Sequence, residues 1–138
     1  MLKTVKSKHK NLTFFIMDLY ISVLKKYVVF SGRARRNEYW MFMLFNMIFM
    51  CIAAIIDNIT GLATDAGYGV FYAIYGIAVM LPSLAVSVRR LHDIGKSGWM
   101  LLIGLIPIVG GIVLLVFAIK DSQPGDNEYG ANPKETIA

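Results

Sequence analysis

Three long stretches without a charged residue constrain this chain more than any other feature of its sequence. No Asp, Glu, Lys or Arg occurs in residues 39–56, 66–88 or 97–119. A helix needs about 20 mostly apolar residues to cross the roughly 30 Å hydrocarbon core of a bilayer. Each stretch is therefore long enough to span a membrane, the first by the smallest margin. Three such stretches in a chain of 138 residues leave too little polypeptide to cover them as the core of a soluble protein.

The composition supports a membrane protein and argues against an ordinary water-soluble enzyme. Hydrophobic residues make up 57% of the chain and charged residues 17%, against about 45–50% and about 25% in an average soluble chain. Because hydrocarbon offers no partner to the backbone, the spanning segments must be helices or a closed barrel, and the alternating strands of a barrel are not visible. We therefore expect an all-α integral membrane protein with three transmembrane helices. Pro82, Pro107, Gly110 and Gly111 are expected to kink these helices without ending them.

The segment before the first stretch is expected to form an amphipathic helix over residues 13–27 that lies in the membrane interface. Asp18 interrupts its apolar residues, which argues against a cleavable signal peptide. Lys25 and Lys26 would lie near anionic headgroups, and a soluble helix docked on the loops is the alternative. The chain is thus divided into a basic N-terminal extension (1–16), a single transmembrane domain (17–134) and a polar, turn-rich C-terminal tail (120–138).

The distribution of basic residues predicts the orientation. Most of the 14 Lys and Arg residues precede residue 39 or lie between the second and third stretches, and the loop 57–65 contains none. The positive-inside rule then places the N-terminus in the cytoplasm, and three spans place the C-terminus in the periplasm or outside the cell. The alternative is that the third stretch doubles back at residues 107–111, which returns the tail to the cytoplasm. Each half would then have only about 11 residues, too few to span a bilayer.

Three polar blocks flank these stretches and resemble the motifs of a known family. They read FSGRARRNEYW at 30–40, RRLHDIGKSGW at 89–99 and DSQPGDNEYGANP at 121–133. In this order they resemble F-x-G-R-x-x-R-x-E-Y-W, R-R-L-H-D-x-G-K/R-S-G-W and P-G-x-N-x-Y/F-G-x-N/D-P of the bacterial membrane family known as domain of unknown function 805. The resemblance covers about residues 17–134 and departs from the pattern at Met100 and Ala131. It implies a bacterial inner-membrane protein and no established reaction.

The first two blocks share the cytoplasmic face in this arrangement, so their charged residues form the candidate site. The site is either a charge cluster or a lipid-phosphate site, and its members are Arg33, Arg36, Glu38, Arg89, Arg90, His92, Asp93 and Lys96. In the structural interpretation, Glu38 pairs with an arginine of the second block and fixes the spans. In the functional interpretation, arginine forks bind phosphate oxygens. A third interpretation makes His92 a general base oriented by Asp93, although adjacent residues on a helix do not face each other. Trp40 and Trp99 are expected at the membrane–water boundary.

The sequence predicts no catalytic, cofactor-binding or metal-ligating residues. Acidic residues of the tail lack EF-hand spacing, and the net charge of +5 indicates affinity for the membrane rather than for nucleic acid. We expect a non-catalytic partner or assembly protein, or a protein that interacts with anionic phospholipid headgroups. Its partners would be the bilayer and a membrane protein or a second copy. The alternatives are a subunit of an oligomeric small-solute transporter or channel and a lipid-modifying enzyme that uses His92. A transport path would be lined by Tyr68, Tyr72, Tyr75, Ser83 and Ser87.

Overall fold

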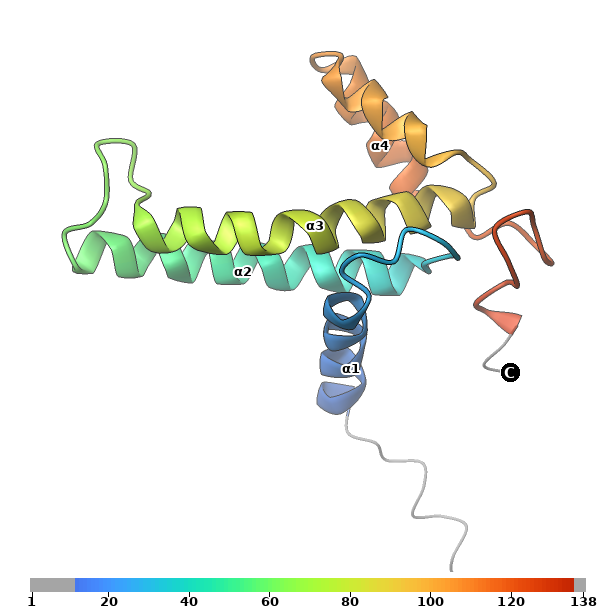
Figure 1. The fold of residues 1–138 in the computed structure, drawn as a ribbon, viewed down its shortest axis with the longest axis horizontal. Coiled ribbons are helices and arrows are strands. Elements are labelled where there is room, and N and C mark those ends of the chain that lie inside the picture. Colours follow the sequence, from blue (N-terminus) through green and yellow to red (C-terminus); the bar gives the residue numbers. More distant parts are fainter. Residues whose placement is uncertain (1–11, 136–138) are drawn as a thin grey trace, which may run out of the picture.

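The computed structural model describes residues 12–135, and the helices in this part of the chain are arranged around one long pair. In chain order they are α1 (Leu12–Lys25), α2 (Arg36–Ile59), α3 (Val70–Asp93), the 3₁₀ helix η1 (Gly98–Leu105) and α4 (Val109–Ile119). Helices α2 and α3 lie side by side and antiparallel, while α1 leaves this pair on one side and η1 with α4 on the other (Figure 1). Both arms join the half of the pair that contains the start of α2 and the end of α3. The all-α fold class is confirmed for the described residues.

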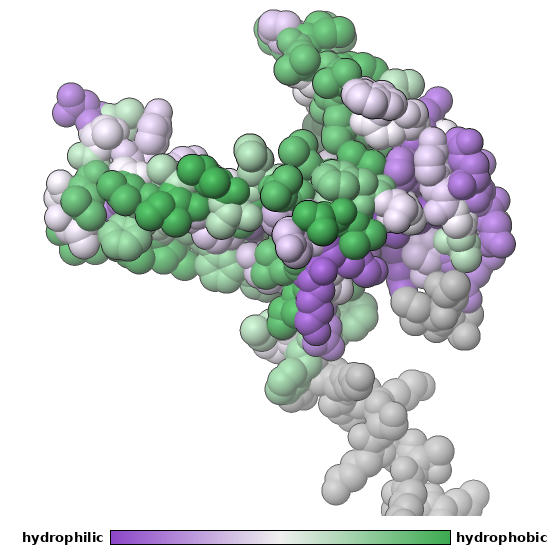
Figure 2. All heavy atoms as spheres, viewed as in Figure 1, coloured by the Kyte–Doolittle hydropathy of each residue, from purple (hydrophilic) through white to green (hydrophobic). Residues whose placement is uncertain are grey.

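Helices α2 and α3 are long and apolar enough to cross a membrane. Helix α2 covers the first expected span (39–56) and continues past Asp57. Helix α3 begins four residues later than the second expected span (66–88) and continues past Arg89. Their outward side chains are apolar and exposed, as in Ile59 (79%) and Ile77 (71%). Figure 2 shows hydrophobic residues along the pair and hydrophilic residues gathered at the end where α2 begins and α3 ends. Lipid contact accounts for so large an exposed apolar surface.

Asp57 connects the far end of α2 to the start of α3. Its side chain is fully buried and accepts backbone hydrogen bonds from Gly69 (3.0 Å), Phe71 (3.0 Å) and Tyr72 (2.9 Å). The first N–H groups of a helix have no partner within the helix, and a negative charge there is stabilised by the helix dipole. A carboxylate at the end of an apolar stretch is thus explained as a cap of the following helix.

We expect Asp57→Ala to lower the free energy of unfolding by about 1–3 kcal/mol, because it leaves buried N–H groups without an acceptor. Reversible unfolding in mixed micelles of mild detergent and SDS measures this loss. Asp65→Ala, in the exposed part of the same loop, is the matched control and should leave stability unchanged. Equal losses in both variants would contradict the capping role.

Helix α1 packs against the pair through one face only. Val23 is fully buried, and Tyr20 stacks on Phe42 with ring centroids 5.4 Å apart. Phe14 and Phe15 on the opposite face are 63% and 50% exposed. The helix expected over residues 13–27 is therefore present, and its position in the membrane interface stays a prediction.

The third charge-free stretch does not form one continuous helix. Residues 106–108 turn the chain back, so that η1 and α4 form a hairpin (Figure 1). Ile108 adopts a positive φ of 65° at this turn. A Cβ atom on Gly110 would lie 1.9 Å from the carbonyl oxygen of Ile103, so the two limbs can approach only because residue 110 is glycine. The expectation that Pro107, Gly110 and Gly111 merely kink a spanning helix is therefore wrong, since they lie at or beside the turn.

Neither limb of the hairpin is long enough to cross a bilayer alone. At about 2.0 Å per residue in a 3₁₀ helix and about 1.5 Å in an α-helix, each limb is roughly 16 Å long, about half of the hydrocarbon thickness. After α4 the tail returns to the end of the pair where α2 begins, and Arg36 lies 3.6 Å from Asp121. This contact disagrees with the expectation that the tail lies across the membrane from the first two blocks, and the side on which the tail lies stays a prediction.

Candidate functional site

A single carboxylate binds two buried arginines where the three polar blocks meet. Asp93, in the last turn of α3, accepts from Arg33 Nε at 3.1 Å through Oδ1 and from Arg90 Nη1 at 2.8 Å through Oδ2. Oδ2 also accepts from the Ser122 hydroxyl at 2.6 Å. The side chains of Asp93, Arg33 and Arg90 are 0%, 1% and 3% exposed. We call Arg33, Arg90 and Asp93 the arginine clamp.

Backbone carbonyls of the C-terminal segment satisfy the remaining guanidinium groups of the clamp. Arg33 donates to the carbonyl of Asp93 and to those of Gln123, Gly125 and Gly130. Arg90 donates to the carbonyls of Phe117, Ala118 and Lys120. The acceptors of Arg90 lie at the C-terminus of α4, where the helix dipole is negative and stabilises a cation. The second positive charge of the clamp is thus offset by the backbone rather than by a second acid.

Arg89 and Glu38 form a second ion pair beside the clamp. Arg89 Nη1 lies 3.0 Å from Glu38 Oε1, and the two side chains are 2% and 12% exposed. The expected contact between Glu38 and an arginine of the second block is therefore present. Arg89 Nε and Nη2 are buried, and neither has a hydrogen-bond partner within residues 12–135.

His92 and Asp93 do not act as a pair. His92 Nδ1 lies 3.2 Å from the carbonyl oxygen of Gly32, and the ring stacks on Tyr129 at 3.8 Å between centroids. The carboxylate of Asp93 is occupied by the clamp and by Ser122. The geometry therefore gives no support to a general base at His92 that is oriented by Asp93.

The remaining basic members of the candidate site are more exposed. Arg36 is 43% exposed and pairs with Asp121, which also accepts a hydrogen bond from Lys134. The Lys134 ammonium holds the pKa of the Asp121 carboxyl below its ordinary value, so this carboxyl is charged at neutral pH. Lys96 is half-buried in the turn after α3 and makes no ion pair among the described residues.

The two tryptophans both lie near the hydrophilic end of the molecule. Trp40 donates through Nε1 to the carbonyl oxygen of Ala118 at 3.3 Å and is 39% exposed. Trp99 begins the hairpin and is 80% exposed. Both positions suit the membrane–water boundary, where tryptophan is enriched.

The proposed row of transport residues is divided in the structure. Tyr68 and Tyr72 stack on each other at 5.2 Å, whereas the Tyr75 hydroxyl donates to Asn46 Oδ1 at 2.6 Å and lies 3.3 Å from the Tyr20 hydroxyl. Tyr75 therefore belongs to the contact between α1, α2 and α3. Our sequence analysis missed Asn46, although it is the one amide in the first charge-free stretch.

Sequence analysis also missed the role of the tail. Besides its carbonyls, the tail contributes Asn127, which donates to the carbonyl oxygen of His92 at 2.9 Å, and Gln123, whose N–H donates to the carbonyl oxygen of Asp93 at 2.9 Å. The available signal was the third family motif, which predicts a defined turn structure but not its target. Among residues 12–135, no group of His, Cys, Asp and Glu side chains is arranged to hold a metal ion.

Comparisons with known proteins agree with these features. The family described as protein of unknown function, DUF805, matches residues 27–131, which include the whole arginine clamp. The inner membrane proteins YhaH and YhaI of Escherichia coli K12 are each 48% identical to the chain over 118 residues. These regions cover 86% of this chain and 98% and 97% of the two relatives. No solved structure matches the chain. Together with the two membrane-length helices, the match identifies the chain as a membrane protein of the DUF805 family.

Proposed function

We propose that this protein is a non-catalytic inner-membrane protein whose cytoplasmic end binds anionic phospholipid headgroups. The observation that carries the proposal is the arrangement of the two arms beside the α2–α3 pair (Figure 1). Helix α1 and the η1–α4 hairpin both expose apolar side chains, such as Phe14 and Ile108, and both arms join the pair in the half that contains its basic end (Figure 1). Apolar surface that lies in the interface next to basic side chains is typical of segments that bind anionic membranes.

The charge distribution supports a cytoplasmic position of this end. Within residues 12–135, every Lys and Arg lies either in residues 25–36 or in residues 89–134. The loop 60–69, at the other end of the pair, contains none. The positive-inside rule then favours a two-span topology with a re-entrant hairpin, in which the tail and the start of α2 are both cytoplasmic. The inner-membrane names of YhaH and YhaI support the same membrane for this chain.

Burial decides which basic residues face the lipid in this proposal. Arg33, Arg89 and Arg90 are all buried. The guanidinium groups of Arg33 and Arg90 are already bonded within the protein, so a phosphate group would have to displace those bonds. Lys25 and Lys26 at the end of α1 are exposed and carry no such cost. Headgroup binding is therefore assigned to α1, and the arginine clamp is assigned to holding the arms in position.

We expect the double variant Lys25→Gln/Lys26→Gln to lower the preference for anionic lipid by about fivefold per lysine, since each basic residue near an anionic surface contributes about 1 kcal/mol. The full chain is reconstituted in vesicles of phosphatidylethanolamine with a small amount of spin-labelled phosphatidylglycerol or phosphatidylcholine. The spectra give the relative association of the two lipids with the protein. The wild-type preference should also fall at high salt, because salt screens exposed charges.

The matched control is Lys25→Arg/Lys26→Arg, which keeps both charges and should keep the preference. A wild-type protein that associates equally with both spin-labelled lipids would overturn the proposed function. So would a preference that is unchanged by the Gln substitutions and by salt.

A further inference from the structure

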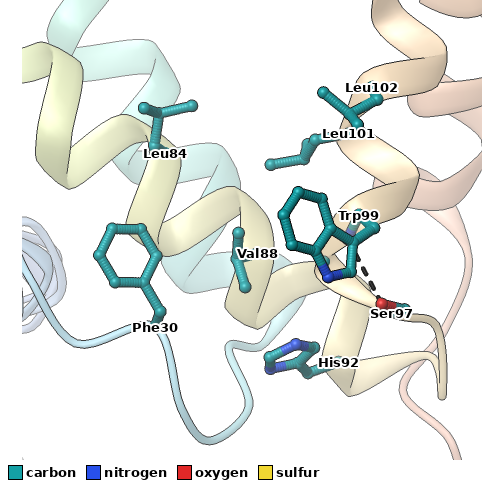
Figure 3. A pocket seen from close by; sticks show the side chains of 9 residues that line it. Phe30, Leu84, Val88, His92, Ser97, Trp99, Leu101 and Leu102 are labelled. Atoms are coloured by element: carbon teal, nitrogen blue, oxygen red, sulfur yellow. Dashed lines mark hydrogen bonds between the residues drawn. The ribbon is translucent and has the colours of Figure 1, made fainter.

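A cavity of about 440 Å³ lies between α3 and the start of the hairpin. Its walls are apolar and are formed by Phe30, Leu84, Val88, Trp99, Leu101 and Leu102. His92 and Ser97 line one end of the cavity, below Trp99 in Figure 3. Leu84 and Leu102 line the opposite end. The volume is within the range of about 300–1,000 Å³ that is usual for small-ligand sites.

The cavity changes from apolar to polar along α3, which spans the membrane in the proposed topology. Leu84, Val88 and His92 follow each other at intervals of four residues on α3, so they lie on one face of the helix. Eight residues of α-helix extend about 12 Å, close to the roughly 15 Å of hydrocarbon in one leaflet. His92 lies in the last turn of α3, and the end of α3 belongs to the hydrophilic end of the molecule (Figure 2). The polar and apolar parts of the cavity therefore match the polar and apolar parts of a lipid in one leaflet.

The lining of the cavity suits the acyl chain of a lipid. Its walls are formed by apolar side chains over about 12 Å of α3, and an acyl chain is long and wholly apolar. The cavity is open to its surroundings, because Trp99 in its wall is 80% exposed. A chain can thus enter from the bilayer.

The polar end of the cavity suits a negative charge. Lys96 directly precedes Ser97 in the turn between α3 and η1 and has no ion-pair partner among the described residues. The Ser97 side chain accepts from the Trp99 N–H at 3.4 Å and keeps its hydroxyl proton for donation.

We propose that this cavity holds one acyl chain of an anionic phospholipid, with the lipid phosphate at the end formed by His92 and Ser97, next to Lys96 in the chain. This inference deepens the proposed function and rests on it for the sign of the lipid charge. It assigns one defined lipid molecule to each protein chain, in addition to the mobile lipids that the lysines of α1 attract. The hairpin forms one wall of the site, which gives the re-entrant fold a direct role in binding.

Native mass spectrometry of the full chain, released from nanodiscs of phosphatidylglycerol and phosphatidylethanolamine, tests the proposal. The wild-type protein should keep one phosphatidylglycerol molecule. Leu102→Trp and Leu84→Trp fill the cavity from opposite walls and should abolish the lipid-bound peak. Leu105→Trp is the matched control, because Leu105 is 79% exposed on the same hairpin and does not line the cavity. Circular dichroism and size-exclusion chromatography establish that each variant is folded. If only one of the two cavity variants folds, that variant alone is enough to test the proposal.

Three results would overturn the inference. They are a wild-type protein without bound phospholipid, a folded cavity variant that keeps as much lipid as Leu105→Trp, and retention of a fatty acid or a peptide in place of the phospholipid. The spin-label experiment separates this inference from the proposed function. A salt-sensitive anionic preference without a retained lipid overturns only the cavity site, whereas retained phosphatidylglycerol without that preference overturns the proposed function and leaves the cavity site.

Discussion

Asp93→Asn should destabilise the protein by about 3–5 kcal/mol, because it removes the only carboxylate among residues 12–135 that contacts the buried guanidinium groups of Arg33 and Arg90. Desolvated charges are tolerated only while they are paired and hydrogen-bonded. The tail carbonyls that remain cannot supply a full negative charge. Reversible unfolding in detergent and SDS, followed by circular dichroism, measures the difference from wild type. Loss of the compact species in size-exclusion chromatography is the expected result if the remaining stability is too small for folding.

Asp121→Asn is the matched control for this prediction. Asp121 also contacts two basic side chains, Arg36 and Lys134, but it is 57% exposed, and exposed ion pairs contribute little because water and salt screen them. A loss in Asp121→Asn as large as that in Asp93→Asn would contradict the structural role of burial. The lipid-phosphate interpretation of Arg90 makes the opposite prediction, because Arg90→Gln would then weaken lipid binding and leave stability intact.

Cysteine labelling should place the tail and the start of α2 on the same side of the membrane. In a Cys51→Ser background, Asn37→Cys and Asp126→Cys should react with an impermeant maleimide only after the inner membrane is permeabilised. Asp65→Cys, in the loop 60–69, should react in intact spheroplasts. All three positions are exposed, so each cysteine should be either fully labelled or not labelled at all. The expectation that the tail and the start of α2 share one side follows from the hydrogen bonds of Arg33 to the carbonyl oxygens of Gln123 and Gly125.

The labelling pattern of Asp126→Cys decides between the two topologies. A third transmembrane span at residues 97–119 would make this position reactive in intact spheroplasts, together with Asp65→Cys. Reactivity of Asn37→Cys in intact spheroplasts would reverse the whole orientation.

The two long helices were predictable because the property that places them, the absence of charge over residues 39–56 and 66–88, is local. The exact ends of these helices were harder to predict from the sequence. Asp57 lies inside α2, and its carboxylate accepts hydrogen bonds from the N–H groups of Gly69 and Tyr72. In the sequence, an acidic residue that caps the next helix looks the same as an acidic residue at the end of a transmembrane helix. Periodicity and charge counts do not separate these two cases.

The third stretch shows where length arguments fail. Residues 97–119 contain enough apolar residues for a span, but the hairpin depends on the close approach of Gly110 to Ile103 and on the positive φ of Ile108. Pro107 and the adjacent glycines suggested a local irregularity, and their effect on chain direction depends on contacts with α3. The expected side of the tail depended on the number of spans, so it rests on the same length argument and is decided by the labelling of Asp126→Cys.

The candidate site was predicted as a set of residues and not as an arrangement. The ion pair of Glu38 with Arg89 follows from opposite charges in two blocks at one end of the fold. The acceptors of Arg33 and Arg90 are mainly backbone carbonyls, and a carbonyl group is present at every residue. The side chains of the tail therefore do not reveal that its backbone carbonyls bind Arg33 and Arg90.

The use of tail carbonyls by the arginine clamp also sets the order in which the fold can be completed during translation. Arg33 and Arg90 leave the ribosome before residues 117–130, which supply most of their acceptors. Until those residues emerge, burial of both guanidinium groups is unfavourable, so the basic end of the nascent chain stays hydrated. In the proposed orientation, its positive charge is therefore accessible while α2 and α3 are inserted, and it is buried in the protein only afterwards.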